Sequence, residues 1–419
     1  MALPRSLAPL RHRPYAALWT GAFCSNIGTW METVAVGILV TEVTGLAVWA
    51  TLVAAAGFVP NAFLGPIGGA LADRIPRRRM LLGATLVQTV LAGVLTTLAA
   101  LDAAEPWAVT LIVLASGCAG ALGFPSYQSM MPDLVPREEL TAAAALGAAQ
   151  WNLGRVVGPA LAGLVIAAGG YEWAFAINTV SFIAVIIAIA PLRLPVPKPK
   201  EGESIPTAIK AGIGYAMRES GIRAVMAYLA LNALLAAPFI GLVPAVAKKI
   251  FHEGRTGTSV LVTAQGIGAV LMALLLGGLA ARFGNRRVVL GALTLLPAAL
   301  VLYAIAPTLE LAAVAIFAVG FLYLGCLSSF TTIAQLRAPP EMRGRIMSGL
   351  MVLLGTLYPL GLLTQGALAD EIGERATTAG AAVILAAALF LVRTTRPGFD
   401  RDLGDIAPRA DTAPIAATE

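Results

Sequence analysis

Twelve apolar stretches, each about as long as a lipid bilayer is thick, limit what this chain can fold into more than any other feature. A helix needs about 20 mostly apolar residues to cross the hydrocarbon core of a membrane. Stretches of this kind lie near 15–41, 47–72, 79–101, 107–131, 140–168, 172–191, 224–247, 257–281, 287–306, 309–334, 345–369 and 377–393. Only 12% of the 419 residues are charged, about half the share in a typical soluble domain. The sequence therefore predicts an all-α membrane protein with twelve transmembrane helices.

The apolar stretches form two sets of six, separated by a polar segment rich in proline and lysine. Proline-rich polar segments are typical of linkers, and the last residues have no apolar face and resemble disordered chains in composition. We therefore expect five parts: a cytoplasmic N-terminus at 1–14, a six-helix bundle at 15–191, a cytoplasmic linker at 192–223, a second bundle at 224–396 and a disordered cytoplasmic tail at 397–419.

Basic residues are distributed unequally between the two sides of the predicted membrane. With both termini on one side, 24 of the 29 Lys and Arg residues fall on that side, four (Lys248, Lys249, Arg255 and Arg375) fall on the other, and Arg155 lies within a span. Short cytoplasmic loops carry such an excess of basic residues. The pattern predicts a multi-pass protein of the cell (inner or cytoplasmic) membrane with both termini in the cytoplasm. Since the basic residues are spread over separate loops, it does not indicate nucleic-acid binding.

An internal repeat relates the two sets of helices. Residues 69–79 read GALADRIPRRR and residues 277–287 read GGLAARFGNRR, which align without a gap at an offset of 208. A second match relates 136–140 to 339–343 at an offset of 203. Two six-helix halves of the same orientation form a parallel repeat, which places a binding cavity between the halves near the middle of the membrane.

Residues 69–79 resemble the signature loop between helices 2 and 3 of the major facilitator superfamily. The match departs at Pro76, where the family usually has glycine, and at Ala281 in the second copy, where the acid is lost. The opening segment 13–31 is similar to a bacterial exporter branch that includes enterobactin-type siderophore exporters and macrolide-efflux-like proteins. This resemblance implies the major facilitator fold, two six-helix pseudo-repeats, a small-molecule substrate and a monomer.

The same resemblance implies a cytoplasmic latch between the loop after helix 2 and the start of helix 11. A carboxylate stabilises a helix N-terminus by about 0.3–1 kcal/mol, and basic residues lie near the start of helix 11. A plain basic loop explains the arginines equally well, but not the glycine and the acid in register with the motif. The latch residues are Gly69, Asp73, Arg74, Arg77 and Arg78, facing Arg343 and Arg345.

Two ionisable side chains, Glu32 and Arg155, lie well inside the predicted spans. Charge within the membrane is costly and suggests function, and the resemblance implies that helices 1 and 5 are neighbours, so we expect the two residues to pair. Burial favours a protonated carboxyl group, whereas a nearby arginine favours a charged one. Glu32 could therefore couple transport to protons, form a permanent ion pair that locks the first half, or lie nearer the outer surface.

Helix 5 contains a segment that resembles the antiporter motif of the superfamily, with Gly154, Gly158, Pro159 and Gly163. Small residues four apart allow another helix to approach closely, and Pro159 removes a backbone hydrogen bond. Ordinary helix packing would use the same residues. Because the motif is typical of exporters, its presence favours efflux over import.

Polar and aromatic residues within the spans are candidates for the substrate cavity, although each could equally serve as a helix–helix hydrogen bond or an interface anchor. They are Asn26, Trp30, Gln150, Asn152, Asn232, Gln265 and Tyr358. A mostly apolar cavity suits a lipophilic or neutral molecule.

We therefore expect a secondary exporter of a drug, siderophore or other small metabolite, driven by exchange with protons. No cofactor, metal site or ATP-binding loop is indicated by the motifs present, and the protein is not expected to be an enzyme. The alternatives are an importer or facilitator of the same fold, a membrane-embedded transferase and a sensor that does not transport.

Overall fold

The computed structural model describes residues 5–72, 74–192 and 214–404. In that part of the chain, twelve helices are long and apolar enough to cross a membrane, which confirms the predicted all-α fold. The first half begins with the short η1 (Arg5–Arg11). Its spans are α1 (Arg13–Thr44), α2 (Ala47–Ala72), α3 (Arg77–Ala100), α4 (Pro106–Met130), α5 (Leu140–Gly169) and α6 (Tyr171–Ile189), with the short turns η2 (Met131–Leu134) and η3 (Arg137–Glu139) before α5.

The second half repeats this arrangement. Its first span is broken into α8 (Ser220–Leu231), the π-helical turn η4 (Asn232–Ala236) and α9 (Phe239–Lys249). The other spans are α10 (Gly254–Phe283), α11 (Asn285–Ile305), α12 (Leu309–Arg337), α13 (Pro340–Ile372) and α14 (Glu374–Thr395), followed by the short α15 (Pro397–Asp402). The sequence predicts one unbroken helix over 224–247. Pro238 lacks an N–H group and cannot continue the hydrogen-bond ladder, which accounts for the break after η4.

Glycines in the left-handed region end four of the long helices. Gly45 (φ 71°) follows α1, Gly170 (φ 87°) follows α5, Gly284 (φ 83°) follows α10 and Gly373 (φ 90°) follows α13. Glycine adopts this conformation without the steric cost that a side chain would add. Gly170 and Gly373 are 203 residues apart, the offset of the second sequence match, so the same tight turn recurs in both halves.

The predicted disordered tail is wrong for its first residues. Leu403 is fully buried, and the Tyr228 hydroxyl donates to Asp400 Oδ1 over 2.6 Å. Arg337 donates from Nη1 to Glu219 Oε1 over 2.7 Å and from Nη2 to the Gly404 carbonyl over 2.9 Å. These contacts fix α15 against the second half. Residues 405–419 and most of the predicted linker lie outside the described residues, although 214–218 are already helical.

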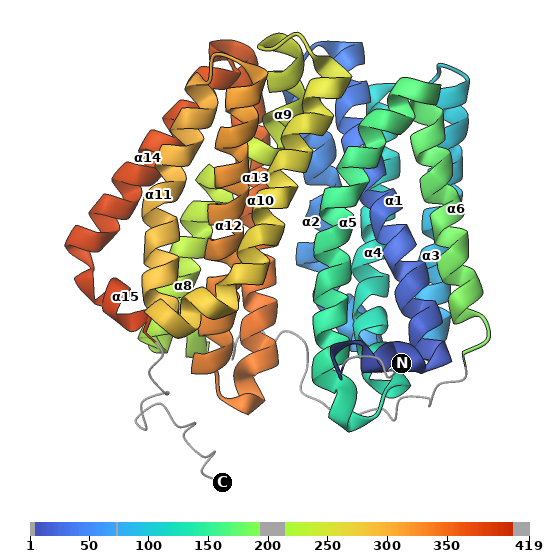
Figure 1. Cartoon of the computed structure of the whole chain (residues 1–419), viewed down its shortest axis with the longest axis horizontal. Helices are drawn as coiled ribbons and strands as arrows, with labels where there is room; N and C mark the ends of the chain where they lie inside the picture. Colours follow the sequence, from blue (N-terminus) through green and yellow to red (C-terminus); the bar gives the residue numbers. More distant parts are fainter. Residues whose placement is uncertain (1–4, 73, 193–213, 405–419) are drawn as a thin grey trace.

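The two halves meet at one end of the bundle and separate at the other (Figure 1). We call the first the closed end; it carries the α1–α2, α9–α10 and α13–α14 turns. We call the second the basic end; it carries η1, α15 and the α2–α3, α4–α5 and α12–α13 connections. Contacts between the halves are made chiefly by α2 with α13, α5 with α10, and α1 and α2 with α9.

Gly68 and Gly69 provide a matched test of the packing between α2 and α4. A Cβ atom on Gly68 would lie 2.8–3.0 Å from backbone atoms of Ala121 and Leu122, whereas one on Gly69 would meet nothing within 4 Å. We expect Gly68→Ala to lower the free energy of unfolding by about 1–3 kcal/mol. Gly69→Ala should be neutral or slightly stabilising, because alanine favours a helix by about 1 kcal/mol over glycine. Thermal unfolding of the purified proteins in detergent measures both, and equal losses in the two variants would contradict this packing.

Candidate functional site

Helices α1 and α5 lie side by side, and three side chains of α1 donate hydrogen bonds to backbone carbonyls on successive turns of α5. The Tyr15 hydroxyl donates to the carbonyl of Ala143 over 3.0 Å, and the Trp19 indole donates to the carbonyl of Leu146 over 3.0 Å. Farther along, the Asn26 amide donates to the Gln150 carbonyl over 3.1 Å. Hydrogen bonds between helices replace those that water would otherwise make, so they fix the register of α5 against α1.

The antiporter-like glycines continue this contact. A Cβ atom on Gly154 would lie 2.8 Å from Asn26 Nδ2, and one on Gly158 would lie 2.6 Å from Trp30 Cβ. Gly163 instead faces the second half, where a Cβ atom would lie 2.5 Å from the Ser259 hydroxyl of α10. The motif therefore packs α5 against α1 and, toward the closed end, against the other half of the protein.

Four aromatic side chains from α1, α4 and α5 form a continuous surface, which we call the aromatic face: Trp30, Phe124, Tyr127 and Trp151. Trp151 lies 6.5 Å from the Trp30 ring and 6.1 Å from the Phe124 ring, and Phe124 lies 6.4 Å from Tyr127, measured between centroids. The Tyr127 hydroxyl donates to Gln150 Oε1 over 3.1 Å, which fixes this ring to α5. Trp151 is 52% exposed and Phe124 is 47% exposed.

Arg155 lies one helical turn after Trp151 and extends the same side of α5. Its guanidinium carbon is 5.5 Å from the centroid of the Trp30 ring, a distance typical of cation–π contacts. Tyr323 on α12 and Tyr358 on α13 are near enough to interact with its charge. Because these two tyrosines belong to the second half, the side of α5 that carries Trp151 and Arg155 faces the space between the halves.

The predicted pair of Glu32 with Arg155 is not formed in this structure. Glu32 Oε2 accepts a hydrogen bond from Asn178 Nδ2 of α6 over 2.6 Å. Helices α1 and α5 are neighbours as expected, but α1 also packs against α6. Trp30 and Glu32 are two residues apart and so lie about 200° apart around the helix. Glu32 is therefore directed to α6, while Arg155 lies beside Trp30.

The other predicted cavity residues have different surroundings. Asn26 and Gln150 are buried; the Asn26 amide donates to the Gln150 backbone carbonyl, and the Gln150 side chain accepts from Tyr127 of α4. Gln265 is buried on α10, and Tyr358 packs edge-on against Phe58 of α2 at 5.2 Å.

Asn232 is fully buried beside the Cys326 thiol, but neither amide atom makes a hydrogen bond of good geometry with a described residue. The side chain of Asn152 is outside the described part of the structure.

The closed end is held by an acid of α13 that caps the start of α2. Asp370 Oδ1 accepts from the backbone N–H of Ala47 over 2.7 Å, and Oδ2 accepts from that of Val48 over 2.9 Å. A helix N-terminus leaves such N–H groups free and carries a partial positive charge. Lys249 of α9 forms ion pairs with Asp370 over 3.0 Å and with Glu374 over 2.8 Å. The second half thus binds the first through an anion at a helix N-terminus.

A second set of contacts at the closed end has the opposite polarity. Lys248 Nζ donates to the carbonyls of Thr41 and Glu42 at the end of α1, over 2.8 and 3.1 Å. A cation is favourable at a helix C-terminus for the same electrostatic reason. Arg255 of α10 forms an ion pair with Glu42 over 3.0 Å and lies 4.8 Å from the Tyr171 ring centroid.

Helices α2 and α13 separate toward the basic end. Thr51 and Ala62 of α2 touch Gly366 and Gly355 of α13. Residues 51, 58, 62, 65 and 69 follow at three-, four- or seven-residue steps and so share one side of α2. A Cβ atom added at Gly65 or Gly69 would nevertheless meet nothing within 4 Å. The interface between the halves therefore ends before α2 reaches the basic end.

Among the predicted latch residues, Arg74, Arg77, Arg78 and Arg343 form no hydrogen bond or ion pair between the halves with a residue that the structure describes. Arg77 bonds to Asp133 over 2.7 Å and to the Ser129 carbonyl over 2.9 Å, and Arg78 bonds to the Ile189 and Ala190 carbonyls, all within the first half. Arg74 and Arg343 are exposed, and Arg345 contacts Met342. Asp73 lies outside the described residues.

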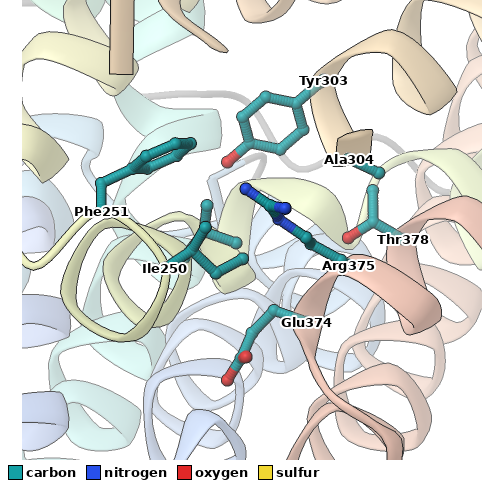
Figure 2. Close-up of a pocket in the computed structure, with 8 residues that line it drawn as sticks. Ile250, Phe251, Tyr303, Ala304, Glu374, Arg375 and Thr378 are labelled. Carbon is teal, nitrogen blue, oxygen red and sulfur yellow. The ribbon is translucent and has the colours of Figure 1, made fainter. Parts of the chain in front are cut away.

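A small pocket at the closed end of the second half is too full to hold a substrate. Arg375 extends between Phe251 and Tyr303 and fills it (Figure 2), and its Nη2 donates to the Ala306 carbonyl over 2.8 Å. The pocket is therefore structural. No three His, Cys, Asp or Glu side chains of the described chain lie together as metal ligands.

Sequence reasoning missed three parts of the site. The first is the rings of Phe124, Tyr127 and Trp151, although their spacing from each other or from Arg155, at three or four residues, places them on shared helix faces. The second is the set of charges at the closed end, including Glu42, Lys248 and Asp370, which reads in the sequence as ordinary loop residues. Asn178, the partner of Glu32, gave no signal that distinguishes it from other polar residues of the spans.

Asp370→Asn should open the closed end, because the amide loses the charge that caps α2 and pairs with Lys249. The probe is a cysteine at Thr51, introduced after replacing Cys24, Cys118 and Cys326. We expect this cysteine to react about ten-fold faster with a water-soluble thiol reagent in the Asp370→Asn variant than in the protein that keeps Asp370. Thr51 is fully buried between the halves here. The neighbouring Glu371 is exposed, so Glu371→Gln is the matched control. An unchanged reaction rate in Asp370→Asn would show that this cap does not hold the end closed.

The comparisons with known proteins agree with this architecture. The chain is 29% identical to the multidrug efflux pump Tap of Mycolicibacterium fortuitum, covering 87% of this chain and 90% of that protein. It is 26% identical to macrolide efflux protein A of Streptococcus pyogenes, covering 86% and 90%. Among solved structures, an inward-facing, unoccupied bacterial homologue of the human lysosomal transporter Spinster has the same fold, with a TM-score of 0.72 at 14% identity over 96% of this chain and 99% of that one. A family model described as transmembrane secretion effector matches residues 5–414, and the chain therefore belongs to this family of major facilitator superfamily transporters.

Proposed function

We propose that this transporter exports a small lipophilic molecule from the cytoplasm by alternating access, in exchange for protons. The observation that carries the proposal is the aromatic face, which lies between two halves that touch at the closed end and separate toward the basic end. Apolar rings with few polar groups are typical of sites for lipophilic ligands. Relatives named as efflux pumps support the outward direction.

The orientation that we propose places the basic end in the cytoplasm of a cell with the protein in its cytoplasmic membrane. The loops at that end hold most of the basic residues, as the positive-inside rule requires. Both termini would then be cytoplasmic, and the structure would represent the state that receives substrate from inside. A single chain contains both halves of the site, so we propose that the monomer is the working unit.

When the cytoplasmic side closes, we propose that Asp73 and the arginines beside it meet the start of α13 near Arg343 and Arg345. Gly69 would then lie against α13, since the side of α2 that touches α13 nearer the closed end continues to Gly69. This contact and the Asp370 cap of α2 would each close one end of the same helix pair.

We propose Glu32 as the residue that binds and releases the proton. Its carboxyl group lies within a span, is bonded to the neutral amide of Asn178, and forms no ion pair with any described residue. A carboxylate without a cation inside a membrane is costly, whereas the protonated acid is not. Movement of α1 against α6 would change the environment of this group.

Glu32→Gln should uncouple transport while keeping the shape and the bond from Asn178. In inverted membrane vesicles with an acidic lumen, we expect wild-type protein to accumulate a neutral lipophilic dye. The variant should lose gradient-driven uptake by about 100-fold or more, the usual loss on removing an acid–base group. Glu105→Gln changes an exposed acid at the start of α4 and should behave as wild type.

The outcomes separate the parts of the proposal. Uptake that is unchanged in Glu32→Gln would remove Glu32 from coupling and leave export standing. Accumulation only in vesicles of the opposite orientation would indicate an importer. Gradient-independent equilibration of the dye would indicate a facilitator.

A further inference from the structure

We propose that the aromatic face and Arg155 together bind an organic acid, a molecule with a planar apolar body and one anionic oxygen group. This inference rests on the proposed function, since it names the chemical class of the transported molecule. The juxtaposition that carries it is a guanidinium without an acidic partner beside a partly exposed surface of aromatic rings at the interface of the two halves.

Arg155 differs from several arginines near the ends of the spans, which have an acidic partner. Arg77, Arg255 and Arg337 each pair with a carboxylate. Arg155 makes no ion pair and no hydrogen bond with a residue that the structure describes; its contact is with the Trp30 ring. An unpaired guanidinium at this depth is costly unless water or a ligand satisfies its five donors. A carboxylate matches these donors in a planar, bidentate geometry.

The neighbouring rings define where the rest of such a ligand would lie. Trp151 precedes Arg155 by one turn on the same side of α5, and its ring meets those of Trp30 and Phe124. About half the surface of Trp151 and of Phe124 is uncovered. Gly147, a further turn toward the basic end, has open space where a side chain would be. A planar ligand could therefore enter from the basic end and stack on these rings.

The second half has two tyrosine hydroxyls that could donate hydrogen bonds to the anionic group of the ligand. Tyr323 and Tyr358 are close enough to Arg155 to feel its charge, and a tyrosine hydroxyl can donate a hydrogen bond to an anionic oxygen. Both tyrosines belong to helices of the half opposite Arg155. An acid bound by Arg155 would thus lie at the interface of the two halves, where a transporter of this repeat type binds its substrate.

The same surface disfavours organic cations. Glu32 is the acidic side chain described within the middle of the spans, and it is directed to Asn178 on α6, away from the Trp30 side of α1. A cation on the aromatic face would meet the positive charge of Arg155 without a nearby carboxylate. The site should therefore prefer an anion to a neutral molecule, and a neutral molecule to a cation.

Three probes with the same naphthalene body and similar size test this order: 1-naphthoate, 1-naphthamide and 1-naphthylmethylammonium. Binding to the purified full-length protein in lipid nanodiscs is measured by isothermal titration calorimetry, without any ion gradient. We expect naphthoate to bind at least about ten-fold more tightly than the amide, as for one charge-assisted hydrogen-bonded contact. Arg155→Gln should bring that ratio close to one, with an unchanged melting temperature as the check on folding.

Two further variants keep the test decisive if Arg155→Gln does not fold. Arg155→Lys retains the charge but loses the planar donors, and should lower the ratio without abolishing it. Trp151→Leu should weaken all three probes by about three- to ten-fold and leave their ratio unchanged. Trp107→Leu, which replaces an exposed indole near the start of α4, is the matched control and should bind as wild type.

The inference is overturned if the cation or the amide binds as tightly as naphthoate, if no probe binds, or if a folded Arg155→Gln keeps the preference. A failure of the proposed function would give a different experimental result. Selective naphthoate binding that depends on Arg155, together with no gradient-driven transport of naphthoate in vesicles, would uphold the binding site and refute proton-driven export.

Discussion

The cost of placing charge in hydrocarbon is the constraint on which the rest of this structure depends. It confines nearly all acids and bases to the two ends of the bundle, leaving Glu32 and Arg155 as separate charged side chains well inside the described spans. Helices without charged surfaces must hold together by close packing and by hydrogen bonds such as those of Tyr15 and Asn26 to α5. Gly154 and Gly158 permit this approach, and they thereby place Trp30 beside Arg155.

The charges excluded from the interior hold the halves together at the closed end. Asp370 binds the start of α2 and Lys248 binds the end of α1, so helix termini of the first half are recognised by charges of the second. If this end opens as proposed, water would hydrate the separated charges and so offset much of the loss of these ion pairs.

Much of the fold follows from the sequence because each span must supply its own backbone hydrogen bonds, so length and apolarity suffice to place it. The site is less accessible to such reasoning. Glu32 and Arg155 stand out by charge, yet which neighbour each one faces depends on rotations of α1 and α5 that no single span encodes. The docked α15 likewise depends on contacts between distant segments, such as the hydrogen bond from Tyr228 to Asp400. The role of Trp151 can be recognised only once its ring is placed beside those of Trp30 on α1 and Phe124 on α4.

Alternating access requires the two ends of the α2–α13 pair to open in turn. Spin labels at Leu101 and Leu311 report the closed end, and labels at Ile75 and Leu336 report the basic end, all at exposed positions. Distances between the two labels of each pair would be measured by electron–electron double resonance, in nanodiscs at acidic and alkaline pH. If the ends open in turn, each pair shows a short and a long distance. A change of pH that favours the long distance at one end then favours the short distance at the other. A single unchanging distance at either end, or both ends lengthening together, would contradict alternating access.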